Sequence, residues 1–291
     1  MILEKSHQDK SQPSVREVVV ITGGGSGMGL SAAKYMPKNK LIILSGRTMS
    51  KLEKAVSELE ALGYQALAHT CDTSSRRSVH ELAAFAALQG RITNVINAAG
   101  LSPSMADPET LLRVNALGTM YINQEFAKVM HSGSVILDVS SNSAYALPGF
   151  VEKLARRSYA VAQKSEDKFM KKMLRFSALP RKEYARRGFA YALSKNFVCW
   201  YASVSAFELG EKGIRVLSLS PGLISTDMGH LEEKEGEKML RESAEHRMGT
   251  PEELGFCIAM AADERNGYLT GVDILADGGA IRHGQLRPLI A

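Results

Sequence analysis

The sequence of 291 residues is poor in cysteine and contains no long hydrophobic run. Its three cysteines are scattered without metal-site spacing, and an odd, sparse set is typical of a reducing compartment. No apolar segment approaches the length of a membrane span, and residues 1–14 lack the apolar core of a signal peptide. We therefore expect a cytoplasmic protein with no bound metal and no membrane partner, whose residues 1–15 form a flexible N-terminal arm.

Acidic side chains are scarce in one part of the chain. The whole chain has 36 Lys or Arg and 31 Asp or Glu, a net charge of +5. Residues 150–190 contain twelve Lys or Arg and four Asp or Glu, a local charge of +8, so the remainder carries −3. The excess of basic side chains in residues 150–190 could bind an acidic partner or simply keep one face of a helix solvated. Because charge comes without a recognition motif, we expect no nucleic-acid partner.

Short apolar segments with strand character alternate with segments of helical periodicity. The predicted strands are residues 18–21, 41–44, 64–69, 94–96, 134–139, 213–218 and 272–275. The predicted helices are residues 30–36, 51–62 and 78–88, a helix that contains Asn115, and residues 195–209. This alternation indicates βαβ units and a parallel sheet with helices on both faces. We expect one α/β domain over residues 16–291, with a doubly wound sheet of about seven strands.

The segment from Val18 to Gly29 reads Val-Val-Val-Ile-Thr-Gly-Gly-Gly-Ser-Gly-Met-Gly. Its β-branched start predicts a buried strand, and the glycines lie between this strand and the first predicted helix. A helix N-terminus offers free N–H groups and a partial positive charge, and glycines let a phosphate approach the backbone. The segment predicts an anion site, although a tight turn without a ligand would have a similar sequence.

The end of the second predicted strand bears on which dinucleotide could bind. NAD specificity usually requires an acidic residue there, which binds the ribose 2′-hydroxyl group. This sequence has Ser45-Gly46-Arg47 instead, without a carboxylate. Arg47 carries a permanent planar charge that suits a 2′-phosphate, although it could also be a solvated surface residue. We therefore expect NADP(H) to be preferred over NAD(H).

Tyr191 and Lys195 place a phenol and an ammonium group four residues apart on one helix face. Since a nearby cation favours the phenolate, we expect Lys195 to lower the pKa of Tyr191 and tune it as a general acid. Ser141 follows a predicted strand at the sheet edge where α/β proteins bind ligands, so its hydroxyl could bond the substrate oxygen. Ser140 and Ser143 are alternatives to it. Each motif alone would also fit a packed or surface residue.

Together these motifs resemble the classical branch of the short-chain dehydrogenase/reductases. The resemblance covers residues 18–279. The motifs occur in family order: Thr22–Gly29, Asp72, Asn97-Ala-Ala-Gly100, Asn115, Ser141, Tyr191 with Lys195, Ser220-Pro-Gly222 with Thr226, and Asp277-Gly-Gly279. The resemblance implies a Rossmann-type fold, an NAD(P)-dependent oxidoreductase and a homodimer or homotetramer. Two positions depart from the pattern, because Ala98 replaces a usual asparagine and Asn142 stands where a glycine commonly follows the serine.

The same resemblance implies roles for individual residues. The catalytic residues would be Asn115, Ser141, Tyr191 and Lys195, with Tyr191 as acid/base, Lys195 also holding the nicotinamide ribose and Asn115 anchoring a relay water. Asp72 would face the adenine. The residues expected at the cofactor are Thr22, Gly23, Gly25, Ser26, Gly27, Met28, Gly29, Ser45, Arg47, Cys71, Asp72, Thr73, Asn97, Ala98, Ala99, Gly100, Tyr191, Lys195, Pro221, Gly222, Ile224 and Thr226, the last four bordering the nicotinamide.

Residues 150–190 interrupt the alternation with a helical insert. Phe169, Met173 and Phe176 recur at helical spacing among basic residues, and Pro180 should end that helix. The insert begins after Ser141 and ends just before Tyr191, so both of its ends are tied to the predicted site. We expect a helical lid over the substrate, with an assembly contact as the alternative. Extra helices are similarly placed in family members that act on steroids and other bulky ketones.

These observations predict an NADP-dependent oxidoreductase. It would transfer hydride between the nicotinamide and a small-molecule ketone or secondary alcohol, with a bulky, apolar, steroid-like substrate. One alternative is a ketoreductase for 3-oxoacyl groups linked to a carrier protein or coenzyme A, which are acidic and would suit the basic insert. An alternative of another class is a non-catalytic NADP-sensing protein, against which the complete catalytic tetrad argues.

Overall fold

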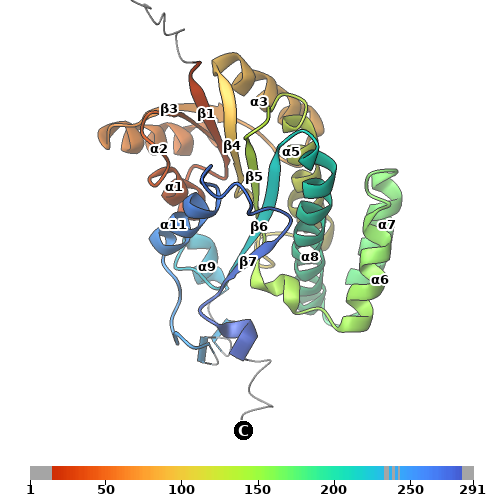
Figure 1. Ribbon diagram of the computed structural model, residues 1–291. Coiled ribbons are helices and arrows are strands. Elements are labelled where there is room, and N and C mark those ends of the chain that lie inside the picture. The colour runs from red at the N-terminus through yellow and green to blue at the C-terminus, as the bar shows by residue number, and fades with distance from the viewer. Residues whose placement is uncertain (1–14, 233–235, 238–239, 242, 284–291) are drawn as a thin grey trace, which may run out of the picture.

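A parallel sheet of seven strands in the order β3-β2-β1-β4-β5-β6-β7 forms the centre of the computed structural model (Figure 1). The structure describes residues 15–232, 236–237, 240–241 and 243–283, so the predicted N-terminal arm, apart from Val15, lies outside the described residues. This sheet confirms the predicted doubly wound α/β fold. Its strands are β1 (Glu17–Thr22), β2 (Leu41–Gly46), β3 (Gln65–Thr70), β4 (Arg91–Asn97), β5 (Val135–Val139), β6 (Arg215–Pro221) and β7 (Asp273–Ala276).

Helices cover both faces of the sheet and connect its strands. They are α1 (Gly27–Ala33), α2 (Met49–Ala61), α3 (Arg76–Gln89), α4 (Pro108–Leu111), α5 (Gly118–Phe126), α6 (Gly149–Tyr159), α7 (Glu166–Ser177), α8 (Glu183–Gly210), α9 (Asp227–Leu231) and α11 (Pro251–Ala261). A π-helical turn, η1 (Leu112–Leu117), joins α4 to α5, and a short 3₁₀ turn, η2 (Asn142–Tyr145), follows β5. No helix in the described parts of the chain is long and apolar enough to cross a membrane.

The alternating side chains of each strand divide the interior into two hydrophobic cores. In β1, Val18 and Val20 belong to the core beneath α3, α5 and α8, whereas Val19 and Ile21 belong to the core beneath α1, α2 and α11. All four side chains are fully buried. The parallel sheet is therefore largely apolar on both sides, although Asn94, Asp138 and Ser218 place buried polar groups within its strands.

The structure differs most from the predicted elements at α11, which no predicted helix covers, and at α8. Helix α8 begins at Glu183, eight residues before Tyr191, which was already expected to share one helix face with Lys195. Residues 181–186 are exposed and therefore carry no hydrophobic periodicity that would mark them as helical. The burial pattern becomes continuous only after Ala190, which explains why the first two turns were missed.

The helical insert forms a hairpin of α6 and α7 on the outer side of α8 (Figure 1). Phe169 and Met173 are fully buried, and the Phe169 ring lies 5.0 Å from the ring of Phe197 in α8, measured between centroids. As predicted, α7 ends before Pro180, at Ser177. The lid over residues 150–190 stays a prediction: the apolar side chains of this hairpin cover α8 and none of them lines the substrate cavity described below, whereas Tyr184 and Gly188, farther along the insert, do line it.

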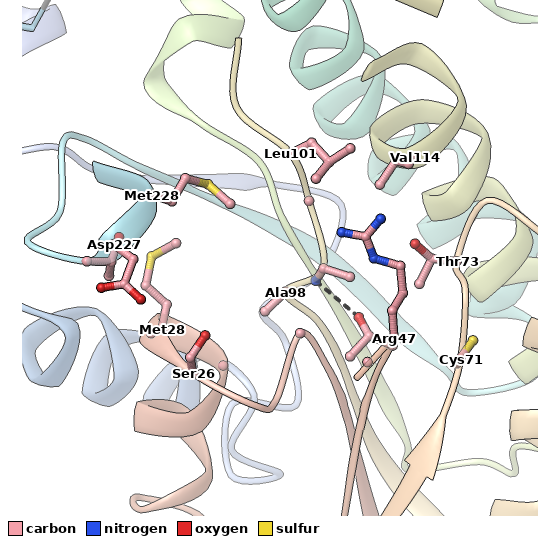
Figure 2. A pocket seen from close by; sticks show the side chains of 18 of the residues that line it. Ser26, Met28, Arg47, Cys71, Thr73, Ala98, Leu101, Val114, Asp227 and Met228 are labelled. Carbon is pink, nitrogen blue, oxygen red and sulfur yellow. Dashed lines mark hydrogen bonds between the residues drawn. The ribbon is translucent and has the colours of Figure 1, made fainter. Parts of the chain in front are cut away.

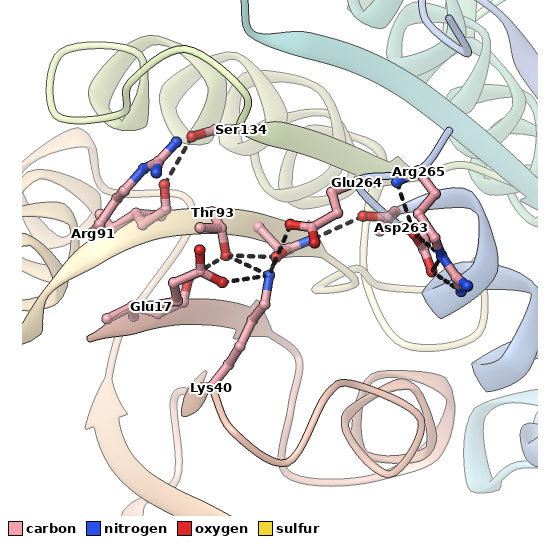
Figure 3. Close-up of polar contacts among 12 residues, drawn as sticks. Glu17, Lys40, Arg91, Thr93, Ser134, Asp263, Glu264 and Arg265 are labelled. Carbon is pink, nitrogen blue, oxygen red and sulfur yellow. Dashed lines mark hydrogen bonds and ion pairs between the residues drawn. The ribbon is translucent and has the colours of Figure 1, made fainter. Parts of the chain in front are cut away.

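A buried cation fixes the edge of the sheet opposite the glycine loop (Figure 3). Lys40 is only 6% exposed, and its ammonium lies 2.9 Å from the Glu17 carboxylate and donates to Thr93 Oγ1 at 3.2 Å. It also donates to the amide oxygen of Asn94, whose own nitrogen donates to the Ala262 carbonyl at 2.8 Å. Because a buried ammonium requires such partners, this network joins β1 and β4 to the end of α11.

Candidate active site

A cavity of about 380 Å³ opens at the carboxyl ends of β1 to β4 (Figure 2). It gathers most of the residues expected at the cofactor, although they come from distant parts of the chain. Those in its wall are Thr22, Gly23, Ser26, Gly27, Met28, Gly29, Arg47, Cys71, Asp72, Thr73, Ala98, Ala99, Gly100 and Thr226. The carboxyl edge of a parallel sheet is where ligands bind in doubly wound folds, so this cavity is the candidate cofactor site.

Two positions require glycine, Gly23 in the loop between β1 and α1 and Gly29 in α1. Gly23 has φ +66°, and a Cβ atom there would lie 2.8 Å from the backbone of Ala98. A Cβ atom at Gly29 would lie 2.5 Å from the Gly23 carbonyl oxygen. Both approaches are too close for any larger residue, so Gly23 lets the loop pack against the end of β4 and Gly29 lets α1 pack against the loop. The first turn of α1 contains no acidic side chain, which leaves its N–H groups suited to an anion.

Three residues expected at the cofactor, Gly25, Ser45 and Asn97, lie outside the cavity wall. Ser45 is fully buried within β2. The Asn97 amide accepts a 2.8 Å hydrogen bond from the Thr22 hydroxyl and donates one of 2.9 Å to Asp138. Asn97 thus orients Thr22, a wall residue, instead of facing the cavity itself.

At the far end of this cavity, Arg47 has no salt bridge with any described residue, whereas the Asp72 carboxylate is hydrogen bonded. Arg47 is exposed, and Figure 2 shows its guanidinium extending into the cavity. The Asp72 carboxylate instead accepts hydrogen bonds from the backbone and hydroxyl of Ser74, at 2.9 and 2.7 Å. Burial raises the pKa of the Cys71 thiol to about 11, so this sulfur stays protonated and is not a nucleophile. The end of β2 therefore offers a positive charge to a ligand.

A second cavity of about 320 Å³ adjoins the first and shares part of its wall. The shared residues are Met28, Ala98, Gly100, Leu101, Thr226 and Met228. The second cavity also contains the expected residues Ser141, Tyr191, Lys195, Pro221, Gly222 and Ile224. The common wall means that a dinucleotide in the first cavity could present its reactive end to a substrate in the second.

Tyr191 lies in the wall of the second cavity and is hydrogen bonded to Ser141. Burial raises the pKa of Tyr191, the bond to Ser141 opposes this rise, and the negative charge of Glu232 adds to it. The Lys195 nitrogen lies 5.8 Å from the centroid of the Tyr191 ring. The prediction that this cation gives Tyr191 a lowered pKa is wrong, because the pKa is raised, with burial as the largest cause. Tyr191 is therefore protonated at neutral pH and can donate its proton.

Lys195 is buried behind Tyr191 and points toward the end of β5. Its ammonium donates a 2.9 Å hydrogen bond to the Val139 carbonyl. Burial lowers the pKa of Lys195 to about 8, although Cys199 and Asp138 partly offset this effect. Lys195 thus keeps most of its charge at neutral pH, at a position where it could bind a second ligand group.

The hydrogen bonds around β5 distinguish three neighbouring serines. The Ser140 hydroxyl donates to the backbone carbonyl of Lys195 at 2.8 Å, so its proton is committed to α8. The Ser141 oxygen accepts from the Ser143 N–H at 3.2 Å and is also bonded to Tyr191. Ser141 directly precedes the turn η2 and caps it, which fixes this orientation. Of the three serines, Ser141 has the geometry expected of a residue that holds a substrate oxygen beside Tyr191.

Asn115 lies outside both cavity walls, in the π-helical turn η1. Its amide accepts from the Leu101 N–H at 2.9 Å and donates to the Leu101 carbonyl at 3.0 Å and to Ser194 at 3.2 Å. Its backbone carbonyl accepts from the Thr119 hydroxyl at 2.8 Å. These contacts support a positioning role, in which Asn115 fixes the Leu101 backbone where the two cavities meet.

Comparisons with known proteins identify the family of this chain. A family model described as short chain dehydrogenase matches residues 17–172. The chain belongs to the short-chain dehydrogenase/reductase family. A second model, described as enoyl-(acyl carrier protein) reductase, matches residues 154–280. As a member of this family, the protein is an oxidoreductase, and the site described above is the candidate active site of such an enzyme.

Relatives of this short-chain dehydrogenase/reductase align over almost the whole chain. Short-chain dehydrogenase/reductase bsc3 of Alternaria brassicicola is 28% identical over 278 residues, which are 92% of this chain and 97% of that protein. The 7alpha-hydroxysteroid dehydrogenase of Escherichia coli K12 is 24% identical, over 90% of this chain and 93% of that protein. The structure of a short chain dehydrogenase from Burkholderia cenocepacia, in complex with NADP, matches with a TM-score of 0.71 and 20% identity. The match covers 90% of this chain and 97% of that chain.

Several residues of this short-chain dehydrogenase/reductase that line the second cavity were missed from the sequence. Tyr184 and Gly188 precede Tyr191 by seven and three residues on α8, so they share one helix face with it and with Lys195. That spacing would have revealed them if the helix had been predicted to begin at Glu183. Others come from loops without a local signal: Ser102, Pro103, Leu223 and Glu232.

Proposed function

We propose that this protein reduces bulky, apolar ketones with NADPH, or oxidises the corresponding secondary alcohols with NADP. The observation that carries the proposal is the hydrogen-bonded pair of Tyr191 and Ser141, which lies in the substrate cavity close to the wall shared with the cofactor cavity. A protonated phenol held beside a hydroxyl group suits the transfer of a proton to a carbonyl oxygen. The two groups can bind that oxygen together.

The residues of the first cavity fit a dinucleotide. The glycine loop gives the close approach that a pyrophosphate needs, and the cavity continues from Arg47 to the wall shared with the substrate cavity. A bound nicotinamide dinucleotide would supply or accept the hydride. Tyr191 would donate its Oη proton to the carbonyl oxygen, Ser141 would hold that oxygen, and Lys195 would bind the ribose hydroxyl groups.

Preference for NADP over NAD is supported by the end of β2. Arg47 extends into the cavity there, and Asp72, at the end of β3, has its carboxylate bonded to Ser74. A guanidinium binds a 2′-phosphate through charge-assisted hydrogen bonds, whereas an NAD site would need a free carboxylate at the end of β2. The related structure from Burkholderia cenocepacia was obtained in complex with NADP.

A bulky, apolar substrate is supported by the second cavity. Its volume of about 320 Å³ is within the range of small-molecule sites. Much of its wall is apolar, with contributions from Leu101, Pro103, Leu223, Ile224 and Met228. A 7alpha-hydroxysteroid dehydrogenase is among the relatives that align with nearly the whole chain. We propose that the bulky, apolar substrates are steroid-like ketones or comparable carbonyl compounds.

A ketoreductase that acts on acyl groups linked to a carrier protein or coenzyme A is the second candidate. Lys168, Lys171, Lys172 and Arg175 lie on the exposed face of α7 at helical spacing, and could attract an acidic carrier. The match to a model described as enoyl-(acyl carrier protein) reductase also favours it. These cations lie outside the substrate cavity, however. They could therefore help an acidic carrier to dock, but they would not determine which acyl group is reduced.

A ketone and alcohol screen with both cofactors tests these alternatives. The proposal predicts NADPH oxidation with bulky neutral ketones and faster turnover than with thioesters of 3-oxoacyl groups. Faster turnover of thioesters would favour the second candidate, and NADP binding without turnover would indicate a non-catalytic sensor. We further propose a cytoplasmic location, consistent with three unpaired cysteines, and a homodimer or homotetramer, which light scattering would test.

A further inference from the structure

One carboxylate lines the substrate cavity beside Tyr191. Glu232 follows α9, and its Oε1 atom accepts hydrogen bonds from the Ser102 hydroxyl at 2.7 Å and the Ser104 N–H at 3.0 Å. Ser102 also lines the cavity, on the segment that joins β4 to α4. The two hydrogen bonds therefore connect two walls of the cavity that are 130 residues apart in the sequence.

The position of this carboxylate is fixed from the other side as well. Asn115 binds both backbone groups of Leu101, the residue directly before Ser102. The wall that holds Glu232 is thus anchored to the turn η1. Because two donors hold Oε1, the carboxylate stays in the cavity wall, and its Oε2 atom keeps the capacity to accept a further hydrogen bond.

Among the described residues, no cation is paired with the carboxylate of Glu232. The Ser102 hydroxyl and the Ser104 N–H, which donate to it, are neutral. The cationic side chain in the same cavity wall is Lys195, whose ammonium is bonded to the Val139 carbonyl. The basic residues of α6 and α7 lie outside the wall. Within the described part of the wall, which also contains Lys195, Glu232 therefore presents to a ligand a negative charge that no salt bridge neutralises.

We propose that Glu232 selects substrates by charge. It disfavours ketones that carry a carboxylate or phosphate inside the cavity, and favours those that carry a hydroxyl or ammonium group there. This inference rests on the proposed ketone reductase function. A like charge in a partly desolvated cavity repels the ligand, whereas a donor group can bond to Oε2. Glu232 also contributes to the raised pKa of Tyr191, so its field reaches the proton donor.

The test uses three aryl ketones of equal length that end in a hydroxymethyl group, a methyl ester or a carboxylate. For the wild-type protein we expect kcat/KM to fall in that order. Glu232→Gln keeps an acceptor oxygen for Ser102 and Ser104 but removes the charge. It should raise the ratio of kcat/KM for the carboxylate over that for the ester by about tenfold. Glu232→Asp keeps the charge and should leave the ratio low.

Glu237→Gln is the matched control, because Glu237 is exposed, outside the cavity wall and paired with Arg241 at 2.6 Å. It removes the same charge and should not change the ratio. An unchanged ratio in Glu232→Gln would overturn the inference. So would a wild-type protein that reduces the ketone bearing the carboxylate as efficiently as the ketone bearing the ester. In both cases, reduction of the ketone that bears the ester would still support the proposed function. If the wild-type protein reduced no ketone, both proposals would be wrong.

Discussion

The ring of Phe169 in α7 packs on the ring of Phe197 in α8, with centroids 5.0 Å apart. Both side chains are fully buried, and Phe197 also stacks on Tyr201. We predict that Phe169→Ala lowers the free energy of unfolding by about 3–5 kcal/mol, because it leaves a cavity in this aromatic cluster. Denaturant titration measures the change.

The same variant separates packing from a lid function. Phe150→Ala in α6 is the control, since Phe150 is 71% exposed and should change stability by less than about 0.5 kcal/mol. Under conditions where it is folded, Phe169→Ala should keep the wild-type ratio of KM values for bulky and small ketones. A selective rise of KM for bulky ketones would show that the hairpin covers the substrate after all.

Arg47→Ala should weaken the binding of NADP and have little effect on that of NAD. A charge-assisted contact with the 2′-phosphate contributes roughly 1.5–3 kcal/mol, which corresponds to an increase of Kd for NADP of about 10- to 150-fold. Fluorescence titration with both dinucleotides measures this. Arg77→Ala is the control, because Arg77 is exposed on α3 and paired with Glu81. An equal loss for both cofactors would show that Arg47 does not contact the phosphate.

Asp138 should make stability depend on pH. It is fully buried in β5, where burial raises its pKa from 3.8 to about 6, although amide donors from Asn97 and Asn123 lower it. Between these values the folded protein binds a proton that the unfolded chain has released. The contribution of protonated Asp138 to the free energy of unfolding is therefore complete below about pH 4 and is lost as the pH rises through 6.

The matching measurement compares unfolding of the wild-type protein with that of Asp138→Asn, which cannot titrate at this position. The free energy of unfolding of the wild type, relative to the variant, should fall by up to about 3 kcal/mol from pH 4 to pH 7. A difference that stays constant over this range would mean that Asp138 has an ordinary pKa in the folded protein.

Local patterns in the sequence were sufficient for much of the fold and for the centre of the site. The glycine loop and the pair of Tyr191 and Lys195 depend on spacing within one strand-turn-helix unit or one helix, which the sequence records directly. Ser141 could be placed at a strand end for the same reason. The seven strands were found because each is a short apolar segment, although their exact ends were not.

The remaining features depend on contacts between distant segments. The apolar stripe of α7 indicated that something must cover it, but not that Phe197 would do so. Asn97 was expected at the cofactor, yet its amide is bound by Thr22 and Asp138. Glu232 gains its place in the cavity from Ser102, 130 residues away, and no local pattern marks it.

The central claim is that Tyr191 supplies the proton for carbonyl reduction in this cavity. The most direct measurement is NADPH oxidation with a bulky neutral ketone by the wild-type protein and by Tyr191→Phe, together with cofactor titration of both. Removing the phenolic hydroxyl should lower kcat by about 10² or more while Kd for NADP stays within about threefold. A variant that binds NADP normally and retains a near-normal kcat would contradict the account.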